Sequence, residues 1–207
     1  MTDTRTQIMN VAEEHFAQFG YEGTSLRGII KDAQVNVAAV AYHFGSKEDL
    51  FAAVTERFAA PVVEQQLARL RAEMQRRGVK IEDVLRAFYE PPVALIKKMG
   101  AKGDVLSQFL GRCHSEPEPV FSMVDKHYAG CRNEFIAAFR KVIPNRSDAD
   151  YEWRFEFMLS IIVTFLTRGK NIRRRYSNTQ TWQVDEVVDL LIGFSAPGMV
   201  SAGHRHV

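Results

Sequence analysis

Apolar residues recur along this chain at steps of three and four, the spacing of one face of an α-helix. No segment alternates with the period of two that is typical of a half-buried strand. The pattern predicts an all-α protein, with helices over about residues 5–19, 26–33, 37–44, 46–77, 81–99, 104–114, 118–142, 149–173 and 183–195.

Capping residues mark several of these predicted ends. Gly20 stops the first helix, because glycine adopts the left-handed conformation without steric cost. Thr24-Ser25 and Asn36 are N-cap residues for the next two helices. Ser46, with Asp49 three residues later, approximates a capping box for the long helix that follows.

Prolines and the C-terminus suggest breaks in this pattern. Pro61 falls inside the long helix and predicts a kink, since proline removes a backbone hydrogen bond and clashes with the preceding turn. Pro91-Pro92 is expected to interrupt the helix over 81–99. Residues 196–207 lack a helical pattern and are expected to be disordered.

The segment 149–173 carries apolar residues all around the predicted helix, so every side must be buried. In a domain of this size, one side can face the core and another a second subunit. The last helix has an apolar stripe that also suits docking. The predicted dimer interface comprises Phe157, Ile161, Phe165, Val187 and Leu191.

Composition narrows the class of protein. The 207 residues are 46% hydrophobic and 25% charged, as in ordinary globular proteins. Two cysteines suit a reducing cytoplasm, and the N-terminus lacks an apolar signal core. The longest strongly apolar stretch, 157–167, is too short to cross a bilayer, so a cytoplasmic protein without a membrane segment is expected. A net charge of +2 requires any nucleic-acid contact to come from a local patch.

Residues 25–44 have the spacing of a helix-turn-helix, in which the second helix enters the DNA major groove. By itself, a pair of short helices with a polar turn also fits a plain helical hairpin. Residues 20–30 (GYEGTSLRGII), 33–35 (AQV) and 41–51 (AYHFGSKEDLF) together resemble the DNA-binding domain of TetR-type transcriptional regulators. The resemblance covers about residues 1–55, and the run 35–47 is similar to a proteobacterial subgroup that includes fatty-acid-responsive repressors.

The resemblance implies a three-helix DNA-binding domain at 1–46 and a larger ligand-binding and dimerisation domain at 47–195. The DNA-contacting residues that it implies are Thr24, Ser25, Arg27, Asn36, Val37, Ala38, Ala39, Tyr42, His43 and Lys47. Two positions depart from the family pattern. Gln34 stands where the turn usually has glycine, so its backbone must tolerate strain or bend differently. Ala41 replaces an aromatic residue and lacks its phosphate contact.

The groove-facing residues are unusually apolar, because Val37, Ala38 and Ala39 offer methyl groups that suit the C5 methyl of thymine. Residues 1–47 contain four Lys/Arg and five Asp/Glu. DNA binding therefore requires acids such as Glu13 and Glu14 to face away from the duplex.

Aromatic residues in the larger domain can line a cavity for an apolar effector, or they can simply pack the core. The subgroup resemblance favours a fatty acid or an acyl thioester as effector. Arg112 is the candidate anchor for a ligand carboxylate, and an internal salt bridge is the alternative. The candidate ligand-binding residues are Phe88, Tyr89, Phe109, Arg112, His114, Phe121 and Phe135.

Other chemistries have weaker support. Cys113, His114, His127 and Cys131 raise the possibility of a zinc-type site, but adjacent helical residues point about a hundred degrees apart, so no metal or cofactor is predicted. No catalytic motif is present. The alternatives to a ligand-responsive, homodimeric repressor on a palindromic operator are a constitutive DNA-binding protein and an all-helical enzyme. That enzyme would use His114 with Glu116 or Glu118.

Overall fold

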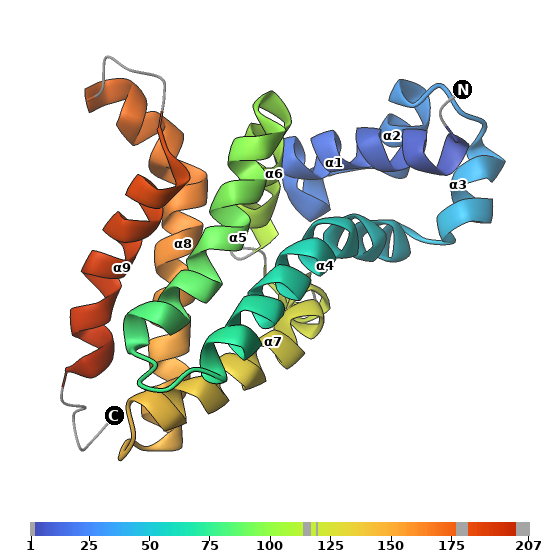
Figure 1. Cartoon of the computed structure of the whole chain (residues 1–207). Coiled ribbons are helices and arrows are strands. Elements are labelled where there is room, and N and C mark those ends of the chain that lie inside the picture. The colour runs from blue at the N-terminus through green and yellow to red at the C-terminus, as the bar shows by residue number, and fades with distance from the viewer. Residues whose placement is uncertain (1–2, 114–116, 119, 177–181, 202–207) are drawn as a thin grey trace. The chain divides into compact units, whose positions relative to one another are not determined.

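Helices make up all the regular structure in the described part of the chain. The structure is a computed structural model that describes residues 3–113, 117–118, 120–176 and 182–201. These residues contain no strand, which confirms the predicted all-α class for them. Figure 1 shows the helices α1 (Thr4–Gly23), α2 (Leu26–Asp32), α3 (Val37–Phe44), α4 (Lys47–Met74), α5 (Ile81–Met99), α6 (Ala101–Cys113), α7 (Val120–Val142), α8 (Asp148–Tyr176) and α9 (Val184–Val200).

The predicted ends of the first helices are confirmed. Gly20 has φ 73°, which breaks the regular helix inside α1 before one more turn forms. At the start of α4, the Ser46 hydroxyl accepts a hydrogen bond from the backbone N–H of Asp49 at 3.0 Å and donates one to its carboxylate at 2.6 Å. α4 continues through Pro61, so this proline does not end the helix.

The expected interruption at Pro91-Pro92 is wrong, because α5 is continuous through both residues. Pro92 has no N–H to donate to the carbonyl of Phe88, four residues earlier. The buried side chain of Gln66 on α4 donates to that carbonyl instead, at 2.7 Å. A residue far away in the sequence therefore satisfies the hydrogen bond that the proline removes.

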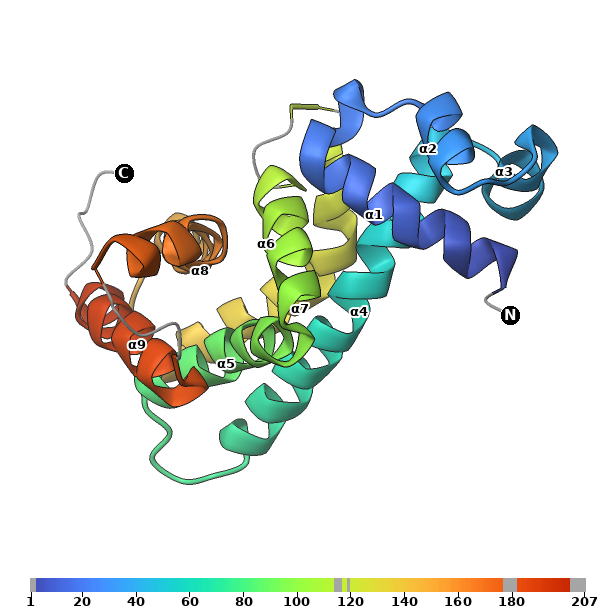
Figure 2. The same ribbon diagram turned by 90° about the horizontal axis from the view of Figure 1, so that it is seen from above.

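The chain divides into two compact units. Unit 1 contains residues 1–61 and 100–127, and unit 2 contains residues 62–99 and 128–207. In unit 1, α6 packs on α1, and α1, α2 and α3 lie together, as Figures 1 and 2 show. This division differs from the predicted domain boundary between residues 46 and 47. The assignment of DNA binding to residues 1–46, and of ligand binding and dimerisation to residues 47–195, stays a prediction.

Helices α5, α8 and α9 meet in the core of unit 2. The hydroxyl of the fully buried Tyr89 lies 2.8 Å from the hydroxyl of Ser195 on α9 and donates to the carbonyl of Met158 on α8 at 3.4 Å. Burial raises the pKa of Tyr89, so its hydroxyl stays protonated. Tyr89, a candidate ligand-binding residue, thus connects three helices.

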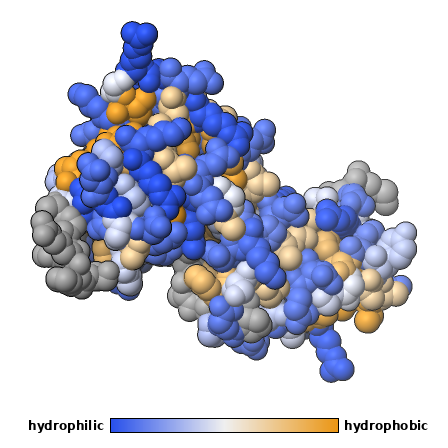
Figure 3. Space-filling view, turned by 90° about the horizontal axis from the view of Figure 1, so that it is seen from below, coloured by the Kyte–Doolittle hydropathy of each residue, from blue (hydrophilic) through white to orange (hydrophobic). Residues whose placement is uncertain are grey.

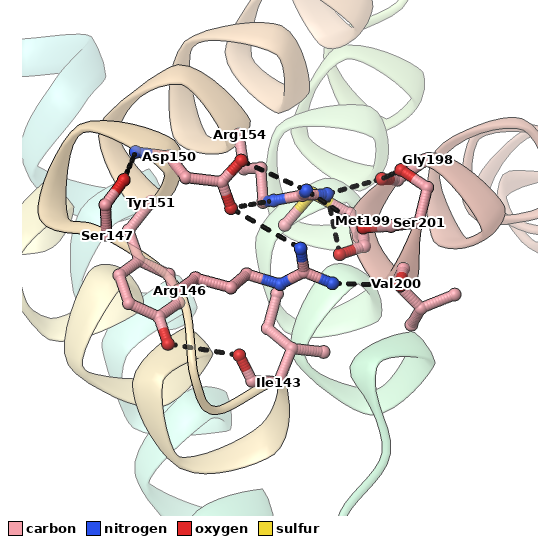
Figure 4. Close-up of polar contacts among 10 residues, drawn as sticks. All are labelled: Ile143, Arg146, Ser147, Asp150, Tyr151, Arg154, Gly198, Met199, Val200 and Ser201. Carbon is pink, nitrogen blue, oxygen red and sulfur yellow. Dashed lines mark hydrogen bonds and ion pairs between the residues drawn. The ribbon is translucent and has the colours of Figure 1, made fainter. Parts of the chain in front are cut away.

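An arginine clamp, defined as Arg146, Asp150 and Arg154, holds the C-terminal end of α9 (Figure 4). Arg154 binds both carboxylate oxygens of Asp150, at 2.6 and 3.1 Å. Its other bonds go to backbone carbonyls, those of Gly198, Met199 and Ser201, and Arg146 donates to that of Val200 at 2.9 Å. Because the last carbonyls of a helix have no helical partner, the clamp satisfies groups that would otherwise need water.

The arginine clamp also explains why the C-terminal end of α9 is helical. Residues 196–200 were expected in a disordered tail, but they are helical and belong to α9. Their sequence contains Pro197 and Gly198, which weaken a helical pattern. Residues 202–207 lie outside the described part of the chain.

Candidate nucleic-acid interface

Side-chain caps build both sides of the turn between α2 and α3. The Ser25 hydroxyl accepts from the backbone N–H of Gly28 at 3.1 Å, at the start of α2. The Asn36 side chain accepts from the N–H of Ala38 at 2.6 Å, at the start of α3. Both predicted caps are confirmed. Because its side-chain oxygen accepts this hydrogen bond, the predicted DNA contact of Asn36 falls to its amide nitrogen.

Gln34 lies at the centre of this turn with φ 52°, in the left-handed region that favours glycine. Its N–H donates to the carbonyl of Lys31, and the N–H of Val35 donates to that of Ile30. These are the two hydrogen bonds of a Schellman motif, which usually has glycine at the position of Gln34. The predicted strain at Gln34 is therefore confirmed, and two hydrogen bonds offset it.

One face of α3 packs against α1 and α2, and the other is exposed. Val40 and Phe44 are buried. Val37 is 72% exposed and Tyr42 is 85% exposed, while Ala38 is exposed between them. Large exposed apolar and aromatic groups on so short a helix cost solvation free energy unless a partner covers them. This face exposes methyl groups and a phenol, and their contact with DNA stays a prediction.

Cationic groups flank α3. Arg27 is exposed on α2. Lys47 begins α4, and its ammonium group lies 4.3 Å from the ring centroid of Tyr21, a cation–π contact. The Tyr21 ring is itself fixed by an edge contact with Phe51 at 5.2 Å. The structure thus holds Lys47 over a rigid aromatic surface, which sequence reasoning did not foresee. Twenty-six positions separate the two residues, so no local pattern signals the contact.

Glu48 completes this contact. The hydroxyl of Tyr21 is hydrogen-bonded to the Glu48 carboxylate, and that bond is the main cause of the lowered pKa of Glu48. Burial raises the pKa of Tyr21. Tyr21 therefore stays protonated and binds one side chain by its ring and the other by its hydroxyl.

The acids of unit 1 are partly paired. Glu13 points toward α4 and lies 2.8 Å from a guanidinium nitrogen of Arg57. Burial raises the pKa of Glu13, and the nearby charge of Arg57 lowers it. On α2, Asp32 lies 2.8 Å from the His15 ring. Glu13 is thus paired inside the unit, as DNA binding requires, whereas Glu14 is exposed.

The burial of Thr24 corrects the prediction that its side chain contacts DNA. Thr24 is only 3% exposed, and its hydroxyl donates to the carbonyl of Gly20 at 2.6 Å. Because α1 breaks at Gly20, this bond stabilises the end of the helix. Thr24 therefore supports the fold. Ala39 and His43 are half-buried on α3, and their DNA contacts stay predictions.

The aromatic residues predicted to line an effector cavity lie in close aromatic contact. In unit 2, the Phe88 ring centroid is 5.1 Å from that of Phe135. In unit 1, the Phe109 ring is 5.8 Å from that of Phe58. Phe121 is 41% exposed on α7, and His114 lies outside the described residues. These contacts favour core packing, and a cavity stays a prediction.

Arg112, the candidate ligand anchor, caps a helix instead. Its Nε donates to the carbonyl of Ala17 and its Nη2 to that of Gln18, both at 2.7 Å. The break at Gly20 frees carbonyl groups in the preceding turn, and a cation is favoured at such a C-terminal end. These bonds favour a structural role within unit 1, through carbonyl groups that the sequence could not identify.

The predicted dimer residues divide into two sets. Val187 and Leu191 are buried within unit 2, so a second chain cannot reach them, and this part of the prediction is wrong. Phe157 is 60% exposed, while Ile161 and Phe165 are half-buried. The apolar stripe of α9 that contains Val187 and Leu191 packs against α5 and not against a second chain.

A different apolar surface is exposed on α8 and α9, defined as the α8/α9 apolar face: Trp153, Phe157, Leu190 and Phe194. The Trp153 and Phe157 rings stack 5.7 Å apart, and Leu190 and Phe194 are 69% and 75% exposed. Hydrophobic residues also occur as patches among hydrophilic surface in Figure 3, so exposure alone does not mark an interface. The α8/α9 apolar face differs from such scattered patches, because it consists of two pairs of large side chains. The two members of each pair are four residues apart on one helix, and the two helices are neighbours.

Alternative chemistries find little support in the described residues. They contain no group of three or more His, Cys, Asp or Glu side chains that could hold a metal ion. Glu118, an alternative catalytic residue, accepts hydrogen bonds from the backbone and hydroxyl of Ser122 in the first turn of α7. His114 and Glu116 lie outside the described residues. No helix of the described residues is long and apolar enough to span a membrane.

Comparison with known proteins adds to this geometry. Residues 8–54 match the model described as bacterial regulatory proteins, tetR family, and residues 86–198 match the tetracyclin repressor-like C-terminal domain. The chain is 36% identical over 194 residues to the HTH-type transcriptional repressor AcnR of Corynebacterium glutamicum, covering 93% of this chain and 92% of that protein. It is 31% identical to the dual regulator CecR of Shigella flexneri, over 58% of this chain and 55% of that protein.

Solved structures share the fold. FadR from Bacillus subtilis, determined in complex with stearoyl-CoA, aligns with a TM-score of 0.68 at 13% identity, covering 93% of this chain and 98% of that chain. The ketosteroid regulator KstR2 of Mycobacterium tuberculosis aligns with a TM-score of 0.60 at 18% identity, covering 96% and 95%.

Proposed function

Because this chain belongs to the TetR family of bacterial regulatory proteins, whose members are DNA-binding transcriptional regulators, we propose that it is a homodimeric repressor. In this proposal α3 of each copy enters the major groove of a palindromic operator. The observation that carries it is the turn between α2 and α3. Two side-chain caps and a Schellman motif hold this turn and leave one face of α3 exposed between flanking cations.

The exposed groups take distinct roles in this proposal. Lys47 contacts a phosphate, held in place by the Tyr21 ring. Arg27 and Asn36 reach base edges, while Val37 and Ala38 pack against thymine methyl groups. Specificity then depends more on apolar contacts than on hydrogen bonds.

A DNA-binding titration with the region upstream of the protein's own operon tests these roles. Lys47→Ala should weaken binding to all sequences about equally and reduce the salt slope by roughly one, since one phosphate contact is lost. Arg27→Ala should change which sequences are preferred. A salt slope that Lys47→Ala leaves unchanged would remove the phosphate assignment, and an absence of any sequence-specific complex would contradict the regulator proposal itself.

Dimerisation is proposed through the α8/α9 apolar face. Trp153 and Phe157 are large rings of the kind enriched at protein interfaces, and they are exposed on α8, as Leu190 and Phe194 are on the neighbouring α9. A two-fold dimer places two recognition helices about 34 Å apart, in successive major grooves.

The effector is proposed to be a small apolar molecule, a fatty acid or an acyl thioester, that favours a different spacing of the two recognition helices. Support comes from the aromatic content of residues 47–195 and from the shared fold of the Bacillus subtilis regulator bound to stearoyl-CoA. The close packing of Phe88 and Phe135 favours the second candidate, a repressor without effector. Native mass spectrometry of the purified protein, followed by titration of any copurified molecule into the DNA complex, separates the two.

A further inference from the structure

Six cationic side chains occur in two segments at one end of unit 2. This cationic end is defined by Lys97 and Lys98 of α5, and by Arg168, Lys170, Arg174 and Arg175 of α8. In the sequence, residues 165–182 carry five Lys and Arg and no acid. The chain has 27 Lys and Arg, and without Lys97, Lys98 and these five the other 20 are outnumbered by 25 Asp and Glu. The net positive charge of the protein is therefore concentrated here, and not in the helix-turn-helix segment.

The tertiary structure brings the two segments together. The ammonium group of Lys97 donates to the carbonyl of Trp182 and lies 4.8 Å from the centroid of its ring. That ring is 6.0 Å from the ring of Phe165 on α8, and Arg168 follows within one turn. Figures 1 and 2 both place the end of α8 beside the start of α9. Trp182 precedes α9 by two residues in the sequence. The end of α5 thus joins the cationic turn of α8.

Three arginines of this surface have no acidic partner in the described part of the chain, although Asp185 lies in the first turn of α9. Lys98, Arg168, Arg174 and Arg175 are exposed, and within the described residues none of these three arginines forms an ion pair. Residues 177–181 are Ser-Asn-Thr-Gln-Thr and carry no charge. Glu186 of α9 accepts from the backbone N–H of Gln183 in a capping box, so its carboxylate serves its own helix.

The helix dipole explains only part of this charge. Cations are favoured near a helix C-terminus, but the effect falls off within the last turn. It accounts for Arg174 and Arg175, and also for Lys97 and Lys98 in the last turn of α5. It does not account for Arg168 and Lys170, which lie more than one turn before the end of α8. Like charges gathered on one surface repel one another unless an anion binds between them.

We propose that the cationic end is a second nucleic-acid-binding surface, which binds the phosphate backbone of duplex DNA without reading its sequence. The cations extend over about 10 Å along α8 between Arg168 and Arg175, which suits a row of phosphates better than one small anion. Protein interfaces are depleted of charge at their centre, so an acidic protein fits less well. The surface belongs to unit 2 and does not depend on α3, so this proposal and the repressor proposal can fail separately.

The test uses the full chain with Arg27→Ala and Lys47→Ala, which weaken the helix-turn-helix contacts. A labelled duplex without the operator is titrated at several salt concentrations. The triple variant Arg168→Gln/Arg174→Gln/Arg175→Gln should bind roughly tenfold more weakly and reduce the salt slope by about 2–3, as expected for three lost phosphate contacts. The control is Arg76→Gln/Arg77→Gln/Lys80→Gln, which removes three exposed cations from the loop between α4 and α5.

Three outcomes would overturn the proposal. The first is an equal loss in both triple variants, which would reflect net charge alone. The second is dissociation of a dimer by the α8 variant in sedimentation, because the cations would then pair with acids of a second copy. The third is tighter binding to polyglutamate than to the duplex, which would indicate an acidic protein partner.

Discussion

Helices α3 and α9 each bury one face and expose apolar side chains on the other, but they are held in different ways. Asn36 caps α3 from the residue before it, and the motif at Gln34 lies two residues further back. The end of α9 is held by Arg146 and Arg154, which are more than 40 residues away in the sequence. α3 is thus placed by local hydrogen bonds, and α9 by an ion network in which Arg154 is buried and Arg146 and Asp150 are half-buried.

The exposed faces differ as well. α3 presents Val37 and Ala38, small groups of the kind that contact thymine methyl groups in the major groove. α9 presents Leu190 and Phe194, and the neighbouring α8 presents the stacked rings of Trp153 and Phe157. Small methyl groups between cations suit DNA, whereas a wide face of large side chains suits another protein chain. This difference indicates that the two helices serve different partners.

The largest expected effect comes from breaking the arginine clamp. Arg154→Ala leaves the carboxylate of Asp150 and several carbonyls of α9 without their donor, and Arg154 is only 7% exposed. The free energy of unfolding should fall by about 3–5 kcal/mol, measured by urea denaturation. The matched control is Arg140→Ala, whose exposed pair with Asp148 should cost about 1 kcal/mol or less. Equal losses in the two variants would show that the clamp contributes no more than a surface pair.

The clamp also predicts a pH dependence. Its hydrogen bond with Arg154 is the first cause of the lowered pKa of Asp150. A lowered pKa means that this contribution to stability is present above the unfolded value of about 4, and is lost as the pH falls through the folded value. Asp150→Asn should remove that part of the acid dependence in the same denaturation experiment.

The next largest effect concerns α9 as an interface. Phe194→Arg places a charge in the α8/α9 apolar face and should weaken the dimer by roughly 2 kcal/mol or more, giving monomers in sedimentation at low concentration. Phe121→Arg, on the exposed surface of α7, should leave the dimer intact. Leu191→Arg should instead lower the stability of the fold, because Leu191 is buried. An intact Phe194→Arg dimer would refute this interface.

The smallest effect concerns the turn before α3. Gln34→Gly removes the strain of a side chain in the left-handed region and should raise the free energy of unfolding by about 1 kcal/mol. Asn145 has φ 66° and provides a comparison, since asparagine tolerates this conformation better. Asn145→Gly should therefore have a smaller effect in the same urea titration. A larger gain at Asn145 than at Gln34 would mean that strain is not what distinguishes the two turns.

Local features of this protein could be predicted from its sequence. Ser25, Asn36 and Ser46 cap helices as expected, because the donor and acceptor of each cap are two or three residues apart. The strain at Gln34 follows from the same local geometry. The resemblance of residues 20–51 to a known DNA-binding domain also lies within one continuous segment.

Other predictions failed because the deciding partner is distant in the sequence. Periodicity placed Leu191 on an apolar stripe, but only the packing of α5 on α9 decides whether that stripe is core or surface. The carbonyl partners of Arg112 are 94 and 95 residues away, so the sequence could not identify them, and its role as a ligand anchor stays a prediction. Pro92 was expected to interrupt a helix, and Gln66, 22 residues from the carbonyl of Phe88, satisfies the group that it frees.

The sequence by itself determined the helices, their caps and the exposed face of α3, because these depend on hydrogen bonds and side-chain spacing within a few residues. The tertiary structure alone decided which apolar stripes are buried, which arginines hold helix ends, and where Lys97 joins the cations of α8. The physical reason is that burial and ion pairing depend on which surfaces meet in space. A stripe of leucines or a single arginine looks the same in the sequence whether its partner is the core, a carbonyl group or another molecule.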